Sequence, residues 1–261
     1  MKVLRFTLSG EHAFFKKPEV NSYCYFTYGN IHKVALLGLF GAILGYGGYS
    51  QMNGFQKSKK SKEVGESYPE FYGKLKDLHI SILPAAKYKK GVIPKKVQIF
   101  NNSVGYASRE QGGNLIIKEQ WLEQPKWEIC LLLDCKEAEK LSEVICEKKC
   151  VYYPYLGKND HPADLTQVSV EEIQKIDFRM GRMDCLVPTD EIDLADLDYE
   201  EKEDMEAFGT FKYIEELPCQ LDGWMNHYIF RTFLYTDEFV EVKHPEVAVY
   251  QLQDKKNILF Y

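Results

Sequence analysis

Aromatic and basic side chains cluster in residues 11–31, the part of the sequence best suited to hold a charged, planar ligand. The cluster comprises Phe14, Phe15, Lys16, Lys17, Tyr23, Tyr25 and Tyr28. Lysines neutralise phosphate groups and aromatic rings stack on nucleobases, so these residue types suit a single-stranded nucleic acid. The same types also build a strand whose aromatic side chains fill a core. The sequence alone leaves both interpretations open.

Cysteine spacing offers a second chemistry, a metal site. The pattern C-x4-C-x10-C-x3-C is formed by Cys130, Cys135, Cys146 and Cys150. Neither pair is C-x-x-C, so we interpret the four as ordinary thiols and predict no metal and no cofactor. The chain has seven cysteines and begins with a strand-like segment instead of an export signal. We therefore expect reduced thiols and a cytoplasmic location.

Motifs of the common hydrolases and nucleotide-binding proteins are absent from the sequence. It contains no Gly-x-Ser-x-Gly, no His-Glu-x-x-His and no phosphate-binding loop. The six histidines are scattered, and an isolated histidine is more often structural or exposed than catalytic: His12, His32, His79, His161, His227 and His244.

Net charge is −6, but the charge is unevenly distributed. Residues 190–206 hold ten carboxylates and one lysine, which leaves 32 basic and 29 acidic residues elsewhere. Patches, and not totals, decide binding to phosphate, so a nucleic-acid ligand is not excluded. We expect the acidic segment to be a solvated loop or a partner-facing surface. A lysine-rich loop at 49–65 either contacts phosphate or is solvated through Lys57, Lys59, Lys60 and Lys62.

The central element of the chain is the apolar segment from Lys33 to Tyr46, KVALLGLFGAILGY. Its good helix formers are interrupted by glycines at 38, 41 and 45, and its other residues are almost all apolar. A membrane span needs about 20 residues, more than this segment has. The glycine spacing fits no phosphate-binding loop. We expect a helix that is buried nearly all round and that another backbone approaches closely at the glycines.

Further elements follow from hydrophobic periodicity. We predict a helix at Lys136–Lys149 and strands at Lys2–Ser9, Leu75–Leu83, Val97–Ser103 and Val151–Leu156. Two further strands, Asn114–Leu122 and Trp127–Leu133, are expected to form an inserted hairpin within residues 104–133. Without this insertion the order is β-α-β-β-α-β, which predicts an α+β, ferredoxin-like domain over residues 1–164. Residues 165–261 are expected to form a smaller β-rich unit with strands at Phe211–Leu217, Tyr228–Tyr235, Glu246–Leu252 and Asn257–Tyr261.

Three stretches, taken together and in this order, resemble the Cas-five family of CRISPR-associated Cascade subunits. The first is Phe6-x-x-x-Gly10 followed by Ala13-x-Phe15-x-Lys17-Pro18. The second is the glycine helix, similar to the signature of a basic residue, Thr and then L-x-G-L-x-G-A-I-L-G. The third is Pro154-Tyr155-Leu156-Gly157-Lys158-Asn159 followed by Ala163-Asp164, similar to a P-x-L-G-basic turn. The resemblance covers about two thirds of the chain.

The resemblance implies a ferredoxin-like (RRM-type) domain with a β-hairpin thumb that caps the five-prime handle of CRISPR RNA (crRNA). It implies as partners the crRNA handle, a Cascade backbone subunit of the Cas-seven family, the Cascade large subunit and, through the complex, target DNA. No membrane partner is expected. Our candidate RNA-binding residues are Lys16, Lys17, Tyr25, Lys33, Tyr46, Tyr106, Arg109, Lys118 and Lys158.

Departures from the family pattern bear on catalysis. The signature threonine is Val34 here, and Ile31 and His32 replace the usual prolines. A branch of the family that cuts precursor RNA is expected to use a tyrosine where this chain has Leu44, together with a Lys-His pair in the thumb region. The only Lys-His dipeptide here is Lys243-His244, near the C-terminus.

These departures favour a non-catalytic RNA-binding subunit, with subtype I-B as the expected setting. A metal-independent endoribonuclease of the same family is the first alternative. A protein-binding module without RNA affinity is the second.

Overall fold

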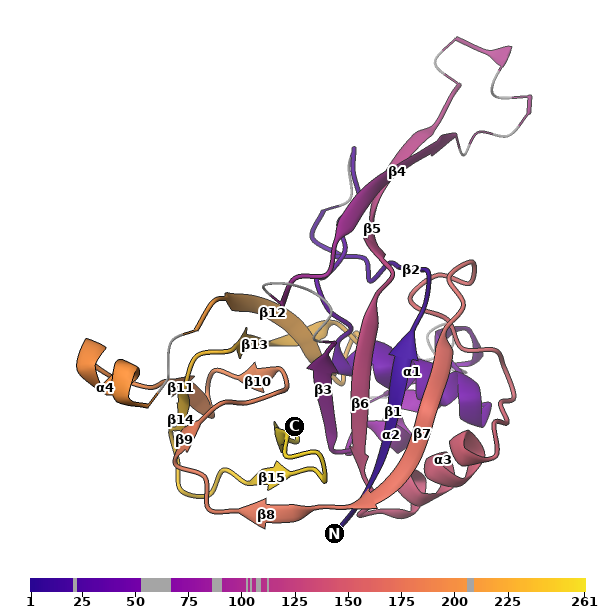
Figure 1. The fold of residues 1–261 in the computed structure, drawn as a ribbon. Helices are drawn as coiled ribbons and strands as arrows, with labels where there is room; N and C mark the ends of the chain where they lie inside the picture. Colours follow the sequence, from indigo (N-terminus) through magenta and orange to yellow (C-terminus); the bar gives the residue numbers. More distant parts are fainter. Residues whose placement is uncertain are drawn as a thin grey trace.

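The computed structural model describes residues 1–20, 23–52, 67–85, 91–101, 103, 105–106, 109–111, 113–205 and 209–261. Lys57, Lys59, Lys60 and Lys62 of the lysine-rich loop, for which phosphate contact and solvation were both left open, lie outside these residues. The fold is α+β, with mostly antiparallel sheets and few helices (Figure 1). No helix in the described ranges combines the length and the apolar character needed to span a membrane.

A four-stranded sheet of order β3-β6-β1-β7 forms the N-terminal half. Its strands are β1 (Lys2–Ser9), β3 (Ile80–Pro84), β6 (Lys126–Leu132) and β7 (Asp164–Glu172). Every neighbouring pair is antiparallel. Leu4, Phe6 and Leu8 of β1 are buried as predicted, but burial does not alternate along the strand, because Val3 and Thr7 on the other face are buried as well. The first predicted strand is confirmed at both ends.

The last strand of this sheet was predicted wrongly. Residues 151–156 form no strand apart from an isolated bridge between Tyr155 and Pro162. The N–H groups of Val151 and Tyr152 instead donate to the carbonyl groups of Ile43 and Ala42, at the end of the glycine helix. Pro154 has no N–H to offer a neighbouring strand. The sheet is therefore completed by β7, and the predicted domain boundary between residues 164 and 165 falls inside that strand.

The glycine helix is α1 (Lys33–Leu44), and it is buried on nearly all sides as predicted. The His32 side chain caps its N-terminus by accepting a hydrogen bond from the Ala35 N–H at 3.2 Å. Gly45 ends the helix in the left-handed region with φ of 76°, a conformation that glycine adopts without strain.

Two further helices pack against α1: α2 (Glu70–Leu75) and α3 (Lys136–Cys146). The predicted close approach occurs at Gly41, where an added Cβ would lie 2.5 Å from Cβ of Phe71. The helix predicted at 136–149 is confirmed in type, and its buried face includes Ala138, Leu141 and Ile145.

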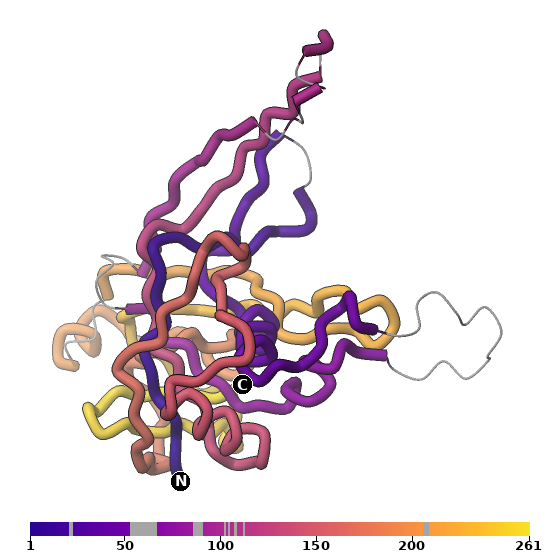
Figure 2. Tube along the Cα trace, turned by 90° about the vertical axis from the view of Figure 1, so that its right-hand side faces the viewer, coloured from indigo at the N-terminus to yellow at the C-terminus, as the bar shows by residue number. Residues whose placement is uncertain are grey.

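A long hairpin of β4 (Lys95–Asn101) and β5 (Ile116–Glu123) projects from the body of the molecule (Figures 1 and 2). Its predicted pairing was wrong, because residues 114–122 pair with β4 and not with residues 127–133. The latter form β6, between β1 and β3. Trp127, Ile129 and Leu131 of β6 are fully buried, which a projecting strand could not achieve. From the N-terminal segment, the short β2 (His12–Ala13) pairs with β5, and Tyr25 forms an isolated bridge to Glu119 of the same strand.

The C-terminal part is rich in short strands, as predicted. The four strands expected there appear as β12 (Lys212–Leu221), β13 (Tyr228–Thr236), β15 (Val249–Gln251) and β16 (Asn257–Leu259). Smaller strands and one short 3-10 helix complete the fold: β8 (Gln174–Ile176), β9 (Met180–Gly181), β10 (Val187–Pro188), β11 (Ile192–Leu194), β14 (Val240–Val242) and η1 (Tyr49–Gln51). One hydrophobic core includes residues from both halves, such as Phe40, Leu221 and Ile258.

The acidic segment is more ordered than the predicted loop. It contains β11 and α4 (Tyr199–Asp204). Asp198 accepts a hydrogen bond from the Glu201 N–H at 2.9 Å, and Glu201 accepts one from the Asp198 N–H at 3.0 Å. This capping box, together with acidic residues in the first turn, stabilises the N-terminus of α4.

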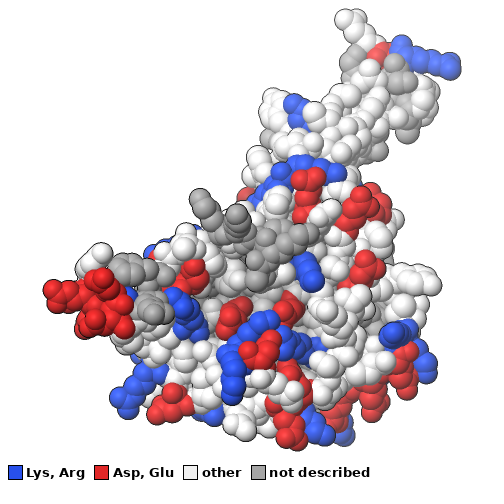
Figure 3. Space-filling view, in the orientation of Figure 1, with Lys and Arg blue, Asp and Glu red and all other residues white. Residues whose placement is uncertain are grey.

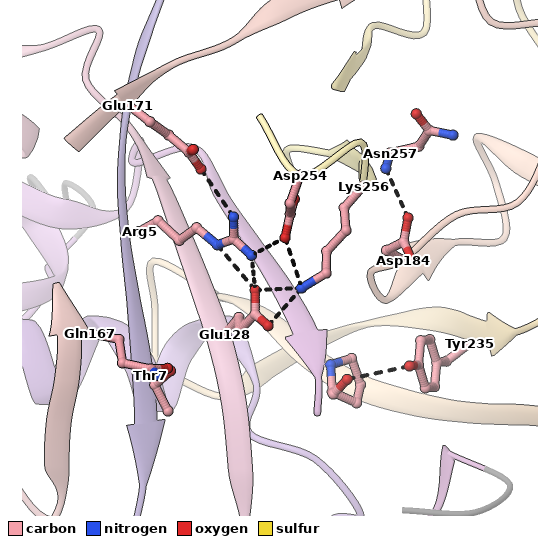
Figure 4. Close-up of polar contacts among 11 residues, drawn as sticks. Arg5, Thr7, Glu128, Gln167, Glu171, Asp184, Tyr235, Asp254, Lys256 and Asn257 are labelled. Atoms are coloured by element: carbon pink, nitrogen blue, oxygen red, sulfur yellow. Dashed lines mark hydrogen bonds and ion pairs between the residues drawn. The ribbon is translucent and has the colours of Figure 1, made fainter. Parts of the chain in front are cut away.

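Charged residues attach the C-terminal turn to the sheet (Figure 4). The Arg5 guanidinium contacts Glu128, Glu171 at 3.3 Å and Asp254 at 2.7 Å, and Lys256 contacts Glu128 at 2.7 Å. Burial opposes the ionisation of Glu128, but hydrogen bonds from Lys256 and Arg5 lower the pKa of this carboxyl overall. Strands β1, β6 and β7 are thereby joined to residues 254–256.

Replacing Gly41 with alanine should destabilise the protein, because the new methyl group would overlap Phe71 where it leaves the α2 backbone. We expect the free energy of unfolding to fall by about 1–3 kcal/mol, as measured by urea denaturation. Gly38→Ala is the matched control, since its Cβ would lie 4.0 Å from the Phe71 ring. There the better helix propensity of alanine should raise stability by up to about 1 kcal/mol. Equal effects of the two variants would contradict the close contact.

Acid should weaken the fold through His32. Burial lowers the pKa of this side chain to about 3, so the native state keeps it neutral while an unfolded chain protonates it near pH 6.5. The stabilisation is complete above pH 6.5 and is lost as pH falls, by about 2 kcal/mol at pH 5 for one histidine. His32→Asn, which preserves a capping side chain, should reduce the difference in unfolding free energy between pH 7 and pH 5. His244→Asn, at an exposed position, should leave the difference unchanged.

Candidate nucleic-acid interface

Four of the nine predicted site residues meet at the base of the β4–β5 hairpin: Lys16, Tyr25, Lys118 and Lys158. The Tyr25 N–H donates to the Lys118 carbonyl at 2.8 Å, and the Gln120 N–H donates to the Tyr25 carbonyl at 2.8 Å. The Phe14 N–H donates to the Leu156 carbonyl at 3.0 Å, which brings the turn containing Lys158 to the same place. Two separate parts of the sequence, segment 11–31 and the turn that contains Lys158, thus meet at β5.

Lys158 lies at the centre of this base. Its ammonium group is 2.9 Å from the Glu119 carboxylate and about 5 Å above two rings, at 5.2 Å from the centroid of Trp121 and 5.3 Å from that of Phe100. The Trp121 indole N–H donates to the same carboxylate at 2.7 Å. Glu119 is only 7% exposed, and these two partners supply hydrogen bonds that its carboxylate would otherwise receive from water. Lys158 therefore fastens the turn to the hairpin.

A histidine completes the packing beneath Lys158. The His161 ring lies edge-on to the Trp121 ring at 4.5 Å between centroids and is buried. Burial lowers its pKa. Both ring nitrogens are buried without a hydrogen-bond partner, which favours the neutral form. Its contribution here is apolar packing.

Lys16 and Lys118 present exposed basic groups at the hairpin base. The Lys16 ammonium group lies 4.1 Å from the centroid of the half-buried Tyr25 ring, a distance that gives a cation–π attraction. Lys118 is opposite Ile99 in the hairpin register. Both side chains are exposed, so a phosphate group of a bound polyanion could approach either of them.

The remaining lysines of the predicted cluster serve the fold. Lys17 forms an ion pair with Glu215 at 2.8 Å. Lys33 is 8% exposed, and its ammonium group donates to the Tyr261 carbonyl at 3.0 Å. Burial lowers the pKa of Lys33. We leave Lys33 out of the proposed interface because RNA cannot reach it without rearrangement of the core.

Tyr46 lies away from the hairpin, beyond the end of α1. Its hydroxyl donates to Glu137 of α3 and accepts from Lys140 at 2.8 Å, and Lys74 lies 4.1 Å from the ring centroid. It thus belongs to a second polar cluster between α2 and α3. Tyr106 and Arg109 are exposed in the distal loop of the hairpin, where Tyr106 is 78% exposed. The structure brings neither group to Lys158.

The aromatic residues of segment 11–31 divide between the two interpretations left open by the sequence. Phe14, Phe15 and Tyr28 are buried in the body, as the core interpretation predicts. Tyr23 is 95% exposed and Tyr25 lines the hairpin. Sequence reasoning missed Glu119 and Trp121, although residues 114–122 were predicted to be a strand. Their role depends on which face of β5 meets Lys158, and that required the pairing with β4.

The four cysteines of the C-x4-C-x10-C-x3-C pattern do not form a common site. Cys130 is buried in the sheet, whereas Cys135, Cys146 and Cys150 are exposed, and all are free thiols. Within the described ranges, no group of three or more His, Cys, Asp or Glu side chains is placed to hold a metal ion.

Surface charge separates the hairpin from the acidic segment. In the view of Figure 3, the hairpin carries few charged groups along its length, and basic and acidic groups lie side by side at its base and near its far end. The acidic side chains of α4 gather on the opposite side of the molecule. A polyanion approaching the hairpin would avoid the strongest local repulsion.

Comparison with known proteins was informative only at the level of structure. No family model and no curated protein matches the sequence. A chain from a "CRISPR RNA-guided surveillance complex" is 10% identical, with a TM-score of 0.50, and the match covers 92% of this chain and 91% of that one. A CRISPR protein from Archaeoglobus fulgidus is 12% identical, with a TM-score of 0.49 over 99% and 98% of the two chains. A chain of a type III-B Cmr-beta complex bound to target RNA has a TM-score of 0.46, 10% identity and coverage of 92% and 86%. The first of these similarities shows that this chain has the fold of a chain found in a CRISPR complex.

Removing Lys158 should destabilise the hairpin base, because Glu119 would remain buried without its cation. We expect Lys158→Met to lower the free energy of unfolding by about 1–3 kcal/mol. Adding Glu119→Gln in the same chain should recover part of that loss, since the uncompensated charge is then gone. Urea denaturation of the two single variants and the double variant measures the coupling. Additive losses would mean that the 2.9 Å ion pair does not hold the turn.

Proposed function

We propose that this protein is a non-catalytic RNA-binding subunit of a type I CRISPR interference (Cascade) complex, of the Cas-five family and subtype I-B. In this role it binds and caps the five-prime handle of crRNA. It also joins a backbone subunit of the Cas-seven family to the large subunit, and it meets target DNA only through the complex.

The sheet topology supports this proposal. Along the chain the elements β1, α1, β3, β6, α3 and β7 follow one another, with the β4–β5 hairpin inserted between β3 and β6. The sheet order β3-β6-β1-β7 places the last strand beside the first. We interpret this as the ferredoxin-like arrangement inferred from the sequence, with the hairpin as the thumb.

The observation that carries the proposal is the projecting hairpin with basic and aromatic groups gathered at its base. Lys16, Tyr25 and Lys118 come together there from two parts of the sequence. Single-stranded RNA is bound by cations on its phosphates and by rings on its unstacked bases. Tyr106 and Arg109 extend the same combination to the far end of the hairpin.

A subunit without nuclease activity is favoured by the residues available for catalysis. Cleavage of RNA needs a base for the ribose 2′-OH, a proton donor for the leaving oxygen and a cation for the phosphate charge. The helix position of the expected tyrosine holds Leu44. Lys243 of the only Lys-His dipeptide pairs with Asp193 at 3.1 Å and donates to the Thr189 carbonyl at 2.7 Å, so it serves the C-terminal part of the fold.

The double variant Lys16→Ala/Lys118→Ala tests the interface. We expect weaker binding to a fluorescein-labelled RNA that carries a CRISPR repeat sequence, measured by fluorescence anisotropy at several salt concentrations. Two lost phosphate contacts should make the slope of log K against log salt shallower by about 1.4. Lys136→Ala/Lys175→Ala removes two exposed lysines elsewhere and should leave the slope unchanged.

Incubation of the protein with the same repeat RNA separates the alternatives. Discrete RNA products formed in the presence of a chelator would support the endoribonuclease. No measurable affinity for the RNA, alone or with the partner subunits, would support the protein-binding module. An unchanged salt slope in the Lys16/Lys118 variant would remove both lysines from the interface.

A further inference from the structure

Three tyrosines in the segment between α3 and β7 are exposed to solvent. Tyr152, Tyr153 and Tyr155 are 62%, 89% and 48% exposed. Tyrosine is usually at least half buried, because its ring gains free energy when removed from water. Three exposed rings within four residues form a local aromatic surface, which we call the tyrosine strip.

The backbone beneath the tyrosine strip is fixed. The Val151 and Tyr152 N–H groups donate to the end of α1 at 2.9 and 3.1 Å, and the Ala163 N–H donates to the Pro154 carbonyl at 3.0 Å. Pro154 restricts the backbone further, and Leu156 is fully buried. The rings therefore stand out from a rigid support, which reduces the conformational entropy that binding would cost.

The tyrosine strip leads to the proposed RNA interface. The chain rises from the end of α3 to the base of the hairpin (Figure 1), where Lys158 contacts Glu119. Residues 148–160 contain three lysines and one aspartate. Lys149 pairs with Glu147 and Lys158 with Glu119, and the exposed Lys148 adds a positive charge beside the strip. An aromatic surface in a locally basic segment suits a polyanion with planar bases better than an apolar protein surface.

We propose that Tyr152, Tyr153 and Tyr155 form a stacking surface for unpaired bases of the bound RNA, adjacent to the hairpin base. This inference rests on the RNA-binding function proposed above. Stacking on a ring is tolerant of base identity, because every base has a planar face. The tyrosine strip would thus lengthen the bound segment of RNA without adding a sequence requirement.

The test compares two triple variants of the full-length protein. Replacing all three tyrosines with serine should weaken binding to the repeat RNA by at least about tenfold, whereas replacing them with phenylalanine should keep affinity within about twofold. In the same RNA, 2-aminopurine placed at successive positions should lose fluorescence where the base stacks on the wild-type protein. The serine variant should restore that fluorescence at a contiguous group of positions. Tyr199→Ser, on α4, is the control for loss of an exposed tyrosine and should change neither readout.

The outcomes separate this inference from the proposed function. If the wild-type protein binds and Lys16→Ala/Lys118→Ala weakens it, but the serine variant binds like the wild type, the tyrosine strip is not an RNA surface. Equal losses in the serine and phenylalanine variants would show that the hydroxyl groups act and would overturn stacking. Absence of RNA binding by the wild-type protein would overturn both proposals. A thermal melt of each variant checks that the fold is kept.

Discussion

Gly41 packs directly against Phe71 because it has no side chain. Neither a methyl group nor a longer side chain would fit between α1 and α2 at this point. The same helix packs on the sheet through Phe40, whose ring lies 6.3 Å from that of Phe6, and it also contacts α3 and β12. A helix enclosed on all sides can carry little polar surface, so its apolar sequence and its small residues are two parts of one constraint. The positions of the sheet, α2, α3 and the C-terminal strands all follow from α1.

Polar contacts then determine how the C-terminal part closes over this centre. Lys33 donates to the carbonyl of Tyr261, the last residue of the chain. On the other side of the sheet, Arg5 joins Glu128 to Asp254. Buried or half-buried charges are costly unless paired, so these groups favour one arrangement of the terminal strands over its alternatives. Buried residues from both halves of the chain belong to one hydrophobic core.

The candidate interface shows that lysines of similar sequence context have different uses. Lys17 and Lys33 stabilise the fold, Lys158 holds the turn to the hairpin, and Lys16 and Lys118 remain exposed. A lysine beside an aromatic ring is attracted to it in either environment, so residue type alone does not separate the roles. The proposed RNA surface therefore contains fewer lysines than the sequence predicted. The proposed tyrosine strip would extend this surface by base stacking instead of phosphate contacts.

Local patterns in the sequence determined β1, α1, α3 and the C-terminal strands, because alternation and helical periodicity reflect burial within each segment. The partner of each strand was beyond those patterns. Residues 116–123 have the pattern of a strand whichever strand they pair with. Because Trp127 of β6 is buried in the central sheet, residues 116–123 pair with β4 instead. Likewise, Glu119 and Lys158 are 39 residues apart in the chain, and nothing in either local sequence records their contact. Tertiary structure alone decided the hairpin register and the composition of its base, because long-range pairing depends on the free energy of the whole core and not on any one segment.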